Sequence, residues 1–212
     1  MAESSVLMSR RFRERLTEKI TEIESVSGAE TVITVSENSG DYQYLNLCSG
    51  IFFGLSAFTY TMFSPEFFPE EWIYFSSLIG FGLGYLFFLV KPLAAMFVSK
   101  EKLGRNTEIY ARACFQKGKI YETSSRQGIL IYISMFERTS VLIGDRNASL
   151  KVPVNEWNLL REKFQKVFHP ISRKKTEENI LLELSLFQDI MKKYIPESGE
   201  INEIPDGLEI FL

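Results

Sequence analysis

Apolar and polar residues divide this chain into one long uncharged stretch and two charged segments that flank it. Across residues 42–99 the charged residues are three glutamates and one lysine: Glu66, Glu70, Glu71 and Lys91. In both flanking segments, charged and apolar side chains alternate at short intervals. The pattern predicts a membrane segment inserted between two parts of an amphipathic fold.

The uncharged stretch contains two runs that are long enough to form transmembrane helices. One extends from Tyr42 to Pro65 and the other from Trp72 to Val90, whereas a helix needs roughly 20 residues to cross the hydrocarbon core. The linking PEFFPEE carries two prolines and three glutamates. We expect a transmembrane hairpin over residues 42–91 and an interfacial segment over 92–99. A hairpin buried in a soluble core is the alternative, although such helices seldom run this long without a charge.

Lysines and arginines predict the orientation of this hairpin. They are absent from the turn between the two runs, and they are frequent in residues 10–19 before the hairpin and 91–112 after it. Because positive residues stay on the cytoplasmic side, both termini should be cytoplasmic and the turn should lie outside. The expected partners are therefore the lipid bilayer and other membrane proteins, or a second copy of the chain.

Glycines in the two runs predict how the helices pack. The sequence Gly80-Phe81-Gly82-Leu83-Gly84 lacks the preceding strand and polar surroundings of a phosphate-binding loop. Gly80 and Gly84 instead form a small-xxx-small face for close helix approach. Two partners fit this face: the first run, which offers Gly50 and Gly54 at helical spacing, or the same helix of a second copy.

The segment before the hairpin predicts one helix and one strand. Residues 9–26 place Phe12, Leu16, Ile20 and Ile23 at the three-four spacing of a buried helix face. The β-branched AETVITVS, residues 29–36, is typical of a strand. A helix should follow the hairpin, capped by Asn106, with Ile109, Ala113 and Phe115 facing inward and Gly118 at its end.

The remainder of the chain completes an α/β pattern. GILIYIS (128–134) and SVLIGD (140–145) read as strands joined by a turn at 137–139, and their near-continuous apolar character suggests burial on both faces. Helices are expected over 154–168 and 174–194. Since neither flanking segment can bury a sheet alone, residues 9–41 and 100–206 should form one discontinuous domain with a three- or four-stranded sheet, ahead of a tail at 207–212.

Composition narrows the chemistry. The net charge is −3, and no arginine or lysine patch interleaved with aromatic residues favours nucleic acid. Cys48, Cys114 and a single histidine, His169, do not supply a zinc site at the usual spacing. We expect no disulfide framework, and we expect His169 to cap or pack rather than to act as a base.

Charged residues at the predicted strand ends are the candidates for a site, since ligands enter α/β sheets there. The rim candidates are Glu30, Arg126, Asp145 and Arg146. The carboxylates could hold Ca²⁺, which requires six to eight oxygen ligands, and an arginine could hold phosphate. The alternative is a solvated turn at Glu137-Arg138 and a surface ion pair at Asp145-Arg146, and we favour it because no catalytic constellation is visible.

Several stretches, in this order, resemble the TPM domain family. ITEIESVSGAETVITVS is similar to its opening helix and strand, and NTEIYARACFQKG with RQGILIYISMFERTSVLIGD is similar to its central helix and hairpin. SGDYQY, NEWNLL and NEIPD resemble its membrane-anchored branch, and the likeness covers most of residues 12–206.

This resemblance implies a Rossmann-like layered domain interrupted by the transmembrane hairpin. It also implies either a non-catalytic role in maintaining or assembling membrane complexes, or a phosphatase or calcium-binding hydrolase activity. The short basic DRNASLKVP departs from the acidic, glycine-rich stretch of the calcium- and phosphatase-linked members. We therefore expect the non-catalytic role, with no confident cofactor and Ca²⁺ as the candidate metal.

Overall fold

A computed structural model describes residues 10–89, 91–168 and 173–196. The predictions for His169 and for the tail at 207–212 lie outside these residues. The chain divides into two compact units, one made of residues 1–39 with 103–212 and the other of residues 40–102. We call them the α/β unit and the hairpin unit, and each is described by itself.

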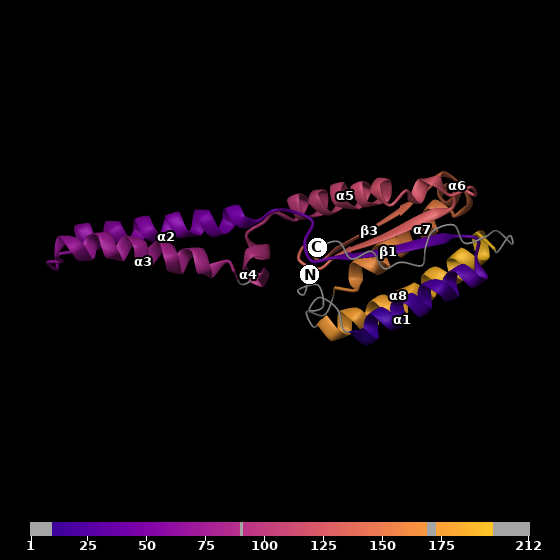
Figure 1. Cartoon of the computed structure of the whole chain (residues 1–212), viewed down its shortest axis with the longest axis horizontal. Coiled ribbons are helices and arrows are strands. Elements are labelled where there is room, and N and C mark those ends of the chain that lie inside the picture. Colours follow the sequence, from indigo (N-terminus) through magenta and orange to yellow (C-terminus); the bar gives the residue numbers. More distant parts are fainter. Residues whose placement is uncertain (1–9, 90, 169–172, 197–212) are drawn as a thin grey trace. The chain divides into compact units, whose positions relative to one another are not determined.

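A three-stranded mixed sheet forms the centre of the α/β unit (Figure 1). Its strands are β1 (Glu30–Ser36), β2 (Gly128–Ser134) and β3 (Thr139–Gly144), in the order β1-β2-β3. β1 and β2 are parallel, with Glu30 opposite Gly128, and β3 is antiparallel to β2. The predicted α/β class is confirmed at this level. The near-continuous apolar sequence of β2 is explained because all of its residues are buried.

Helices cover both faces of this sheet. On one face α1 (Arg10–Val26), α7 (Val154–Lys166) and α8 (Arg173–Tyr194) share a core with the strands, for example Leu16, Leu160 and Leu184 with Ile33 and Ile131. On the other face α5 (Lys100–Lys117) contributes Ala111, Cys114 and Phe115 against Val32, Leu130 and Tyr132. Alternate strand residues point to opposite faces, so β2 serves both cores.

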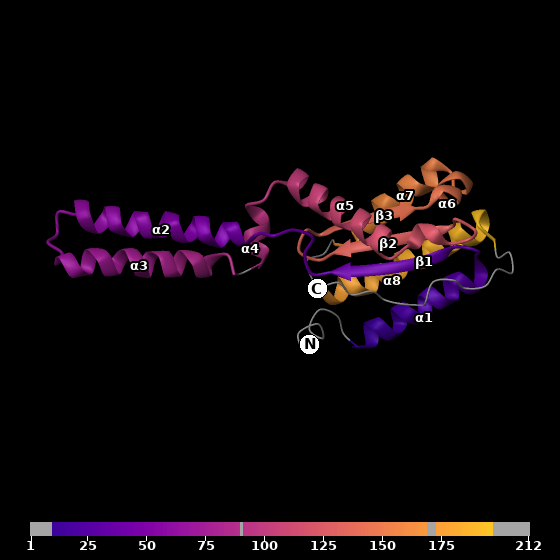
Figure 2. The ribbon, with the colours of Figure 1, turned by 45° about the horizontal axis from the view of Figure 1, so that its top comes forward.

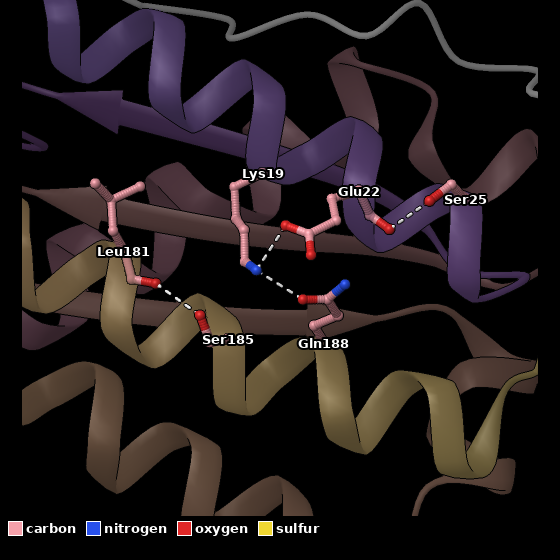
Figure 3. Close-up of polar contacts among 6 residues, drawn as sticks. All are labelled: Lys19, Glu22, Ser25, Leu181, Ser185 and Gln188. Atoms are coloured by element: carbon pink, nitrogen blue, oxygen red, sulfur yellow. Dashed lines mark hydrogen bonds and ion pairs between the residues drawn. The ribbon is translucent and has the colours of Figure 1, made fainter.

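Helices α1 and α8 run parallel, which places their first turns at the same end of the unit. Lys19 Nζ on α1 donates to Glu22 Oε2 at 2.8 Å and to Gln188 Oε1 on α8 at 2.7 Å (Figure 3). Just beyond the ends of both helices, Gly28 N donates to Ile195 O at 2.9 Å. The bond to Lys19 lowers the pKa of the exposed Glu22 carboxyl from its usual value.

The predicted start and inner face of α5 were wrong. Asn106 lies within the helix, which begins at Lys100, where Ser99 Oγ accepts a hydrogen bond from Lys102 N at 3.3 Å. Ile109 is 61% exposed and Ala113 is also exposed, whereas Phe115 is buried as expected. With the earlier start, the buried stripe follows helical spacing through Leu103, Thr107, Ala111, Cys114 and Phe115.

Strand β3 also differs from its prediction. It lies at the edge of the sheet, and only Leu142 is fully buried, so burial on both faces holds for β2 and not for β3. Two short elements were not predicted: the 3₁₀ helix η2 (Ile120–Glu122) and the helix α6 (Arg146–Lys151) directly after β3. The polar sequence of α6 carries too few apolar residues to show a helical period.

The hairpin unit contains α2 (Gln43–Phe63), α3 (Glu70–Phe87) and the short α4 (Lys91–Met96). α2 and α3 lie side by side (Figures 1 and 2). A hydrogen bond between the Thr61 and Ser76 hydroxyls, 3.2 Å apart, joins them.

Candidate functional site

The four predicted rim residues lie at one end of the sheet, where β1 and β2 begin and β3 ends. Glu30 is the first residue of β1, Arg126 precedes β2 by two residues, and Asp145 and Arg146 directly follow β3. Because β3 runs antiparallel to β2, its last residue lies beside the amino ends of β1 and β2.

Backbone hydrogen bonds hold two segments of this end together. Asn147 N donates to Arg126 O at 3.0 Å, and its side-chain amide donates to Ser125 O at 2.7 Å. Asp145 N donates to Gly128 O at 2.8 Å. Arg126 has a φ of 51°, in the left-handed region. These hydrogen bonds hold the backbone around Arg126 close to the backbone around Asp145.

Asp145 caps the helix α6. Its Oδ1 accepts a hydrogen bond from Arg146 N at 2.7 Å, as an N-cap side chain does for a free helical N–H. The Arg146 side chain points to solvent and is exposed. A capping role is sufficient to explain an aspartate at this position, and the metal-ligand reading is not required by the geometry.

A calcium site at this end stays a prediction. Within residues 10–89, 91–168 and 173–196, no three His, Cys, Asp or Glu side chains are grouped closely enough to hold a metal ion. Glu30 and Asp145 would offer two carboxylates, and Ca²⁺ requires six to eight oxygen ligands. The remaining ligands would have to be carbonyl oxygens or water.

The opposite end of the sheet, where β1 and β2 end, carries a buried polar cluster. Glu137 follows β2, and its side chain is only 4% exposed. The alternative of a solvated Glu137-Arg138 turn is therefore wrong for the glutamate. The physical reason is that Ser39, beyond the end of β1, donates a backbone hydrogen bond to the carboxylate, and Ser134 donates a second one.

Both oxygens of the Glu137 carboxylate accept hydrogen bonds. Oε1 accepts from Ser39 N at 2.7 Å, and Oε2 accepts from the Ser134 hydroxyl. Ser39 Oγ in turn donates to Ser134 Oγ at 2.8 Å and lies 2.9 Å from Tyr132 Oη. We call Ser39, Tyr132, Ser134 and Glu137 the polar cluster. Such a cluster stabilises a fold when its members are satisfied, as these are.

Burial raises the pKa of the Tyr132 phenol to about 12, and hydrogen bonds with Ser36 and Ser39 act in the opposite direction. The phenol is therefore neutral at physiological pH. Ser134 and Tyr132 are both fully buried. A serine next to a glutamate could in principle act as a nucleophile and base, but these hydroxyls have no exposed surface for a substrate. The cluster fits a structural role.

Sequence reasoning missed Ser39, Tyr132 and Ser134. The signal was present in the strand itself, because Tyr132 and Ser134 are two residues apart and so share one face of β2. Two polar groups on one face of a strand that is otherwise buried require partners. What the sequence could not show is that Ser39, far away along the chain, is one of them.

Gly50 and Gly54 of α2 and Gly80 and Gly84 of α3 lie at the contact between the two helices. A Cβ at Gly84 would lie 2.5 Å from the Ser49 carbonyl oxygen, and one at Gly80 would lie 2.7 Å from the Phe53 carbonyl oxygen. Gly50 and Gly54 of α2 face α3 in the same way, near Phe81. Of the two predicted partners for the glycine face, the first run is the one seen here.

Large apolar side chains cover the outside of this hairpin. On α2 they include Phe52 at 66% and Phe63 at 78% exposure, and on α3 they include Leu78 at 68% and Leu83 at 64%. Among the described helices, α2 alone is both long and apolar enough to cross a membrane. α3 begins at Glu70-Glu71 and ends at Phe87, so its first turn is charged.

The comparisons with known proteins bear on the fold. No family model matches the chain, and no curated protein matches it. One solved structure is similar along its full length: the NMR structure of the BA42 protein from the psychrophilic bacterium Bizionia argentinensis sp. nov., with 13% identity, a TM-score of 0.59 and complete coverage of both chains. At this identity the similarity concerns the fold alone.

Proposed function

We propose that this chain is an integral membrane protein whose cytoplasmic α/β unit is a non-catalytic module for assembling or maintaining other membrane proteins. We further propose that it belongs to the membrane-anchored branch of the TPM family. The observation that carries the proposal is the apolar outer surface of the α2–α3 hairpin. The similarity in fold to the BA42 protein supports the α/β layering and does not extend to function.

Exposed apolar area supports membrane insertion. Soluble proteins rarely expose contiguous apolar patches beyond a few hundred square ångströms. In the hairpin unit, exposed large apolar side chains recur along both α2 and α3. Near the turn between them, Phe67 is 94% exposed, Trp72 is 59% exposed and Tyr74 is 69% exposed. Trp and Tyr are the residues that favour the membrane interface.

The packing of the two helices supports the insertion of both. α3 meets α2 through Gly80 and Gly84, and its opposite side exposes Phe75, Leu78 and Leu86. A bilayer that accommodates α2 would therefore surround α3 as well. Glu70 and Glu71 would lie at the outer end of α3, where their carboxylates reach the aqueous interface. In the first turn of the helix they also interact favourably with the helix dipole. The hairpin then crosses twice, and both termini are cytoplasmic.

The non-catalytic part of the proposal is supported by the geometry of the polar residues. At the buried end, Glu137 accepts hydrogen bonds from two groups of the protein itself. At the other end, Asp145 caps α6. Both carboxylates thus have hydrogen-bond roles within the fold, which differ from the nucleophile, base and paired-acid roles that hydrolases use.

Topology is tested by cysteine labelling. The free Cys48 is first replaced by alanine, and Glu70→Cys is then introduced into the full-length protein. A reagent that cannot cross membranes should label position 70 in intact cells with the turn outside, and should reach a matched Arg112→Cys only after permeabilisation. The reverse pattern would overturn the orientation. Release of the protein by alkaline carbonate would overturn insertion.

A second experiment separates the module from a hydrolase. The purified protein is incubated with a generic phosphate ester, with and without Ca²⁺ or Mg²⁺, in parallel with Asp145→Asn. We expect no turnover above background in any sample. Membrane proteins cross-linked to the chain in intact membranes should be the same for both forms. Metal-dependent turnover that Asp145→Asn abolishes would establish the phosphatase or calcium-dependent hydrolase instead.

A further inference from the structure

We propose that one end of the α/β unit is a docking surface for anionic phospholipid headgroups of the cytoplasmic leaflet. It is the end at which the chain passes from the unit, after Ser39, into the hairpin unit. This inference rests on the proposed membrane insertion of the hairpin. It adds a specific partner and a defined orientation of the unit on the membrane. We call this region the basic end, and it is formed by the first turns of α1 and α8 and the last turn of α7.

The position of Ser39 defines this end. Its amide donates to Glu137 and its hydroxyl contacts Ser134 and Tyr132, so it is held at the carboxyl ends of β1 and β2. The following helix α2 begins at Gln43. At about 3.5 Å per extended residue, the chain can place Ser39 no more than about 14 Å from the start of α2. With the hairpin inserted as proposed, this short linker tethers the Ser39 end of the unit to the membrane.

Three helix termini gather at the same end. α1 and α8 are parallel, because Lys19 is level with Gln188 and Gly28 is level with Ile195, and both begin on the side where β1 ends (Figure 2). The last turn of α7 lies against the turn after β2. Gln165 Nε2 donates to Arg138 O at 3.0 Å, and an Arg138 guanidinium nitrogen donates to Phe168 O.

These termini are rich in positive charge. The first six residues of α1, RRFRER, hold four arginines and one glutamate. The first six residues of α8, RKKTEE, hold three basic residues and two glutamates, and EKFQK at the end of α7 holds two lysines and one glutamate. The excess is notable because the whole chain carries a net charge of −3. Glu37, near Ser39, is a further acid at this end.

Several of these cations are free to meet a surface. Arg11, Arg15 and Lys175 are exposed, and they come from two helices. Lys166, by contrast, forms an ion pair with Glu162. Basic residues beside a membrane span attract the anionic cytoplasmic leaflet, and this attraction acts within a Debye length of the surface. The basic residues lie at the end of the unit from which the chain continues into α2, so phospholipid headgroups are the partner that their charge and position fit.

The test uses the full-length protein in nanodiscs of phosphatidylcholine alone or mixed with phosphatidylglycerol. Both native cysteines are replaced by alanine, and a nitroxide is attached at Glu14→Cys on α1 or at Glu122→Cys at the other end of the unit. Accessibility to a water-soluble nickel relaxation agent is then measured. The docking variant combines Arg11→Gln, Arg15→Gln and Lys175→Gln. The matched control removes the same charge elsewhere, through Lys117→Gln, Lys192→Gln and Lys193→Gln.

We expect the label at position 14 to be several-fold less accessible in the anionic discs, and the label at 122 to be unchanged. High salt should restore access, and so should the docking variant, whose docking constant should fall on the order of 100-fold at about fivefold per basic residue. The control should behave like the wild type.

Equal access in both lipids, or shielding that salt and the docking variant leave intact, would overturn the proposal. The salt arm needs no substitution, so it stands even if the docking variant folds poorly. A protein that does not remain with the nanodisc would instead refute membrane insertion.

Discussion

Removing the Glu137 carboxylate should destabilise the α/β unit more than any exposed charge substitution. The side chain is 4% exposed and accepts hydrogen bonds from Ser39 N and Ser134 Oγ. Glu137→Ala leaves both donors buried without their acceptor. Each unsatisfied donor costs about 1–3 kcal/mol, so the loss should be about 2–6 kcal/mol. Glu137→Gln keeps one acceptor oxygen and should cost about half of that amount.

The assay is thermal unfolding of the full-length protein in detergent, followed by circular dichroism. For a domain of this size each kcal/mol corresponds to about 2–4 °C in Tm, so Glu137→Ala should lower the Tm by roughly 5–20 °C. Hydrogen exchange provides the local test, because the Ser39 amide should lose its protection in Glu137→Ala. The matched control is Glu162→Gln, which removes an exposed ion pair worth about 0–1 kcal/mol.

The reasoning would be refuted if Glu137→Ala unfolded within a degree or two of the wild type, or if the Ser39 amide stayed protected. Either result would mean that the acceptors of these hydrogen bonds are not needed for the end of β1 to hold its position.

Three further outcomes follow from particular contacts. Gly84→Ala should loosen the α2–α3 pair because the new Cβ meets a carbonyl of the facing helix, while Gly82→Ala on the same helix has nothing within 4 Å and should be neutral; cross-linking of cysteine pairs across the hairpin reports the difference. Tyr132→Phe should remove a tyrosine that titrates at about pH 12 in absorbance. Since that folded pKa lies above the ordinary value, the phenol's contribution to stability is complete below about pH 10 and is lost between pH 10 and 12. Gly128→Ala should strongly lower the Tm because its Cβ would overlap a backbone carbonyl, whereas Gly104→Ala, with open space around it, should be neutral or slightly stabilising.

The sequence was sufficient for elements whose apolar residues follow one period. α1 was predicted from Phe12, Leu16, Ile20 and Ile23, and all four are buried. β2 was predicted with its bounds, because seven uncharged residues lie between a polar connector and the turn that carries Glu137 and Arg138. In such cases the burial that stabilises the element is also the pattern that reveals it.

Prediction failed for the start of α5, for Glu137 and for Asp145, each for a different reason. The inner face of α5 was placed on Ile109 because its start was assigned to Asn106, whereas Ser99 begins the helix. Glu137 was read as solvated because its partner Ser39 precedes it by almost one hundred residues, across the whole hairpin. Asp145 was read as a possible ligand because α6, the helix that it caps, has no apolar period.

The position of the hairpin within the domain explains why the domain tolerates it. It lies in the connection from β1 to α5, and α5 leads on to β2, which pairs in parallel with β1. Parallel neighbours need a crossover connection in any case, so a long insertion replaces a loop and leaves the pairing intact. Loop-closure entropy rises by only about 0.6 kcal/mol for each doubling of the loop length. The end of β1 must nevertheless stay in place where the chain leaves the sheet for the hairpin. The polar cluster holds Ser39 there. The insertion therefore gives a structural reason for a buried carboxylate at this position.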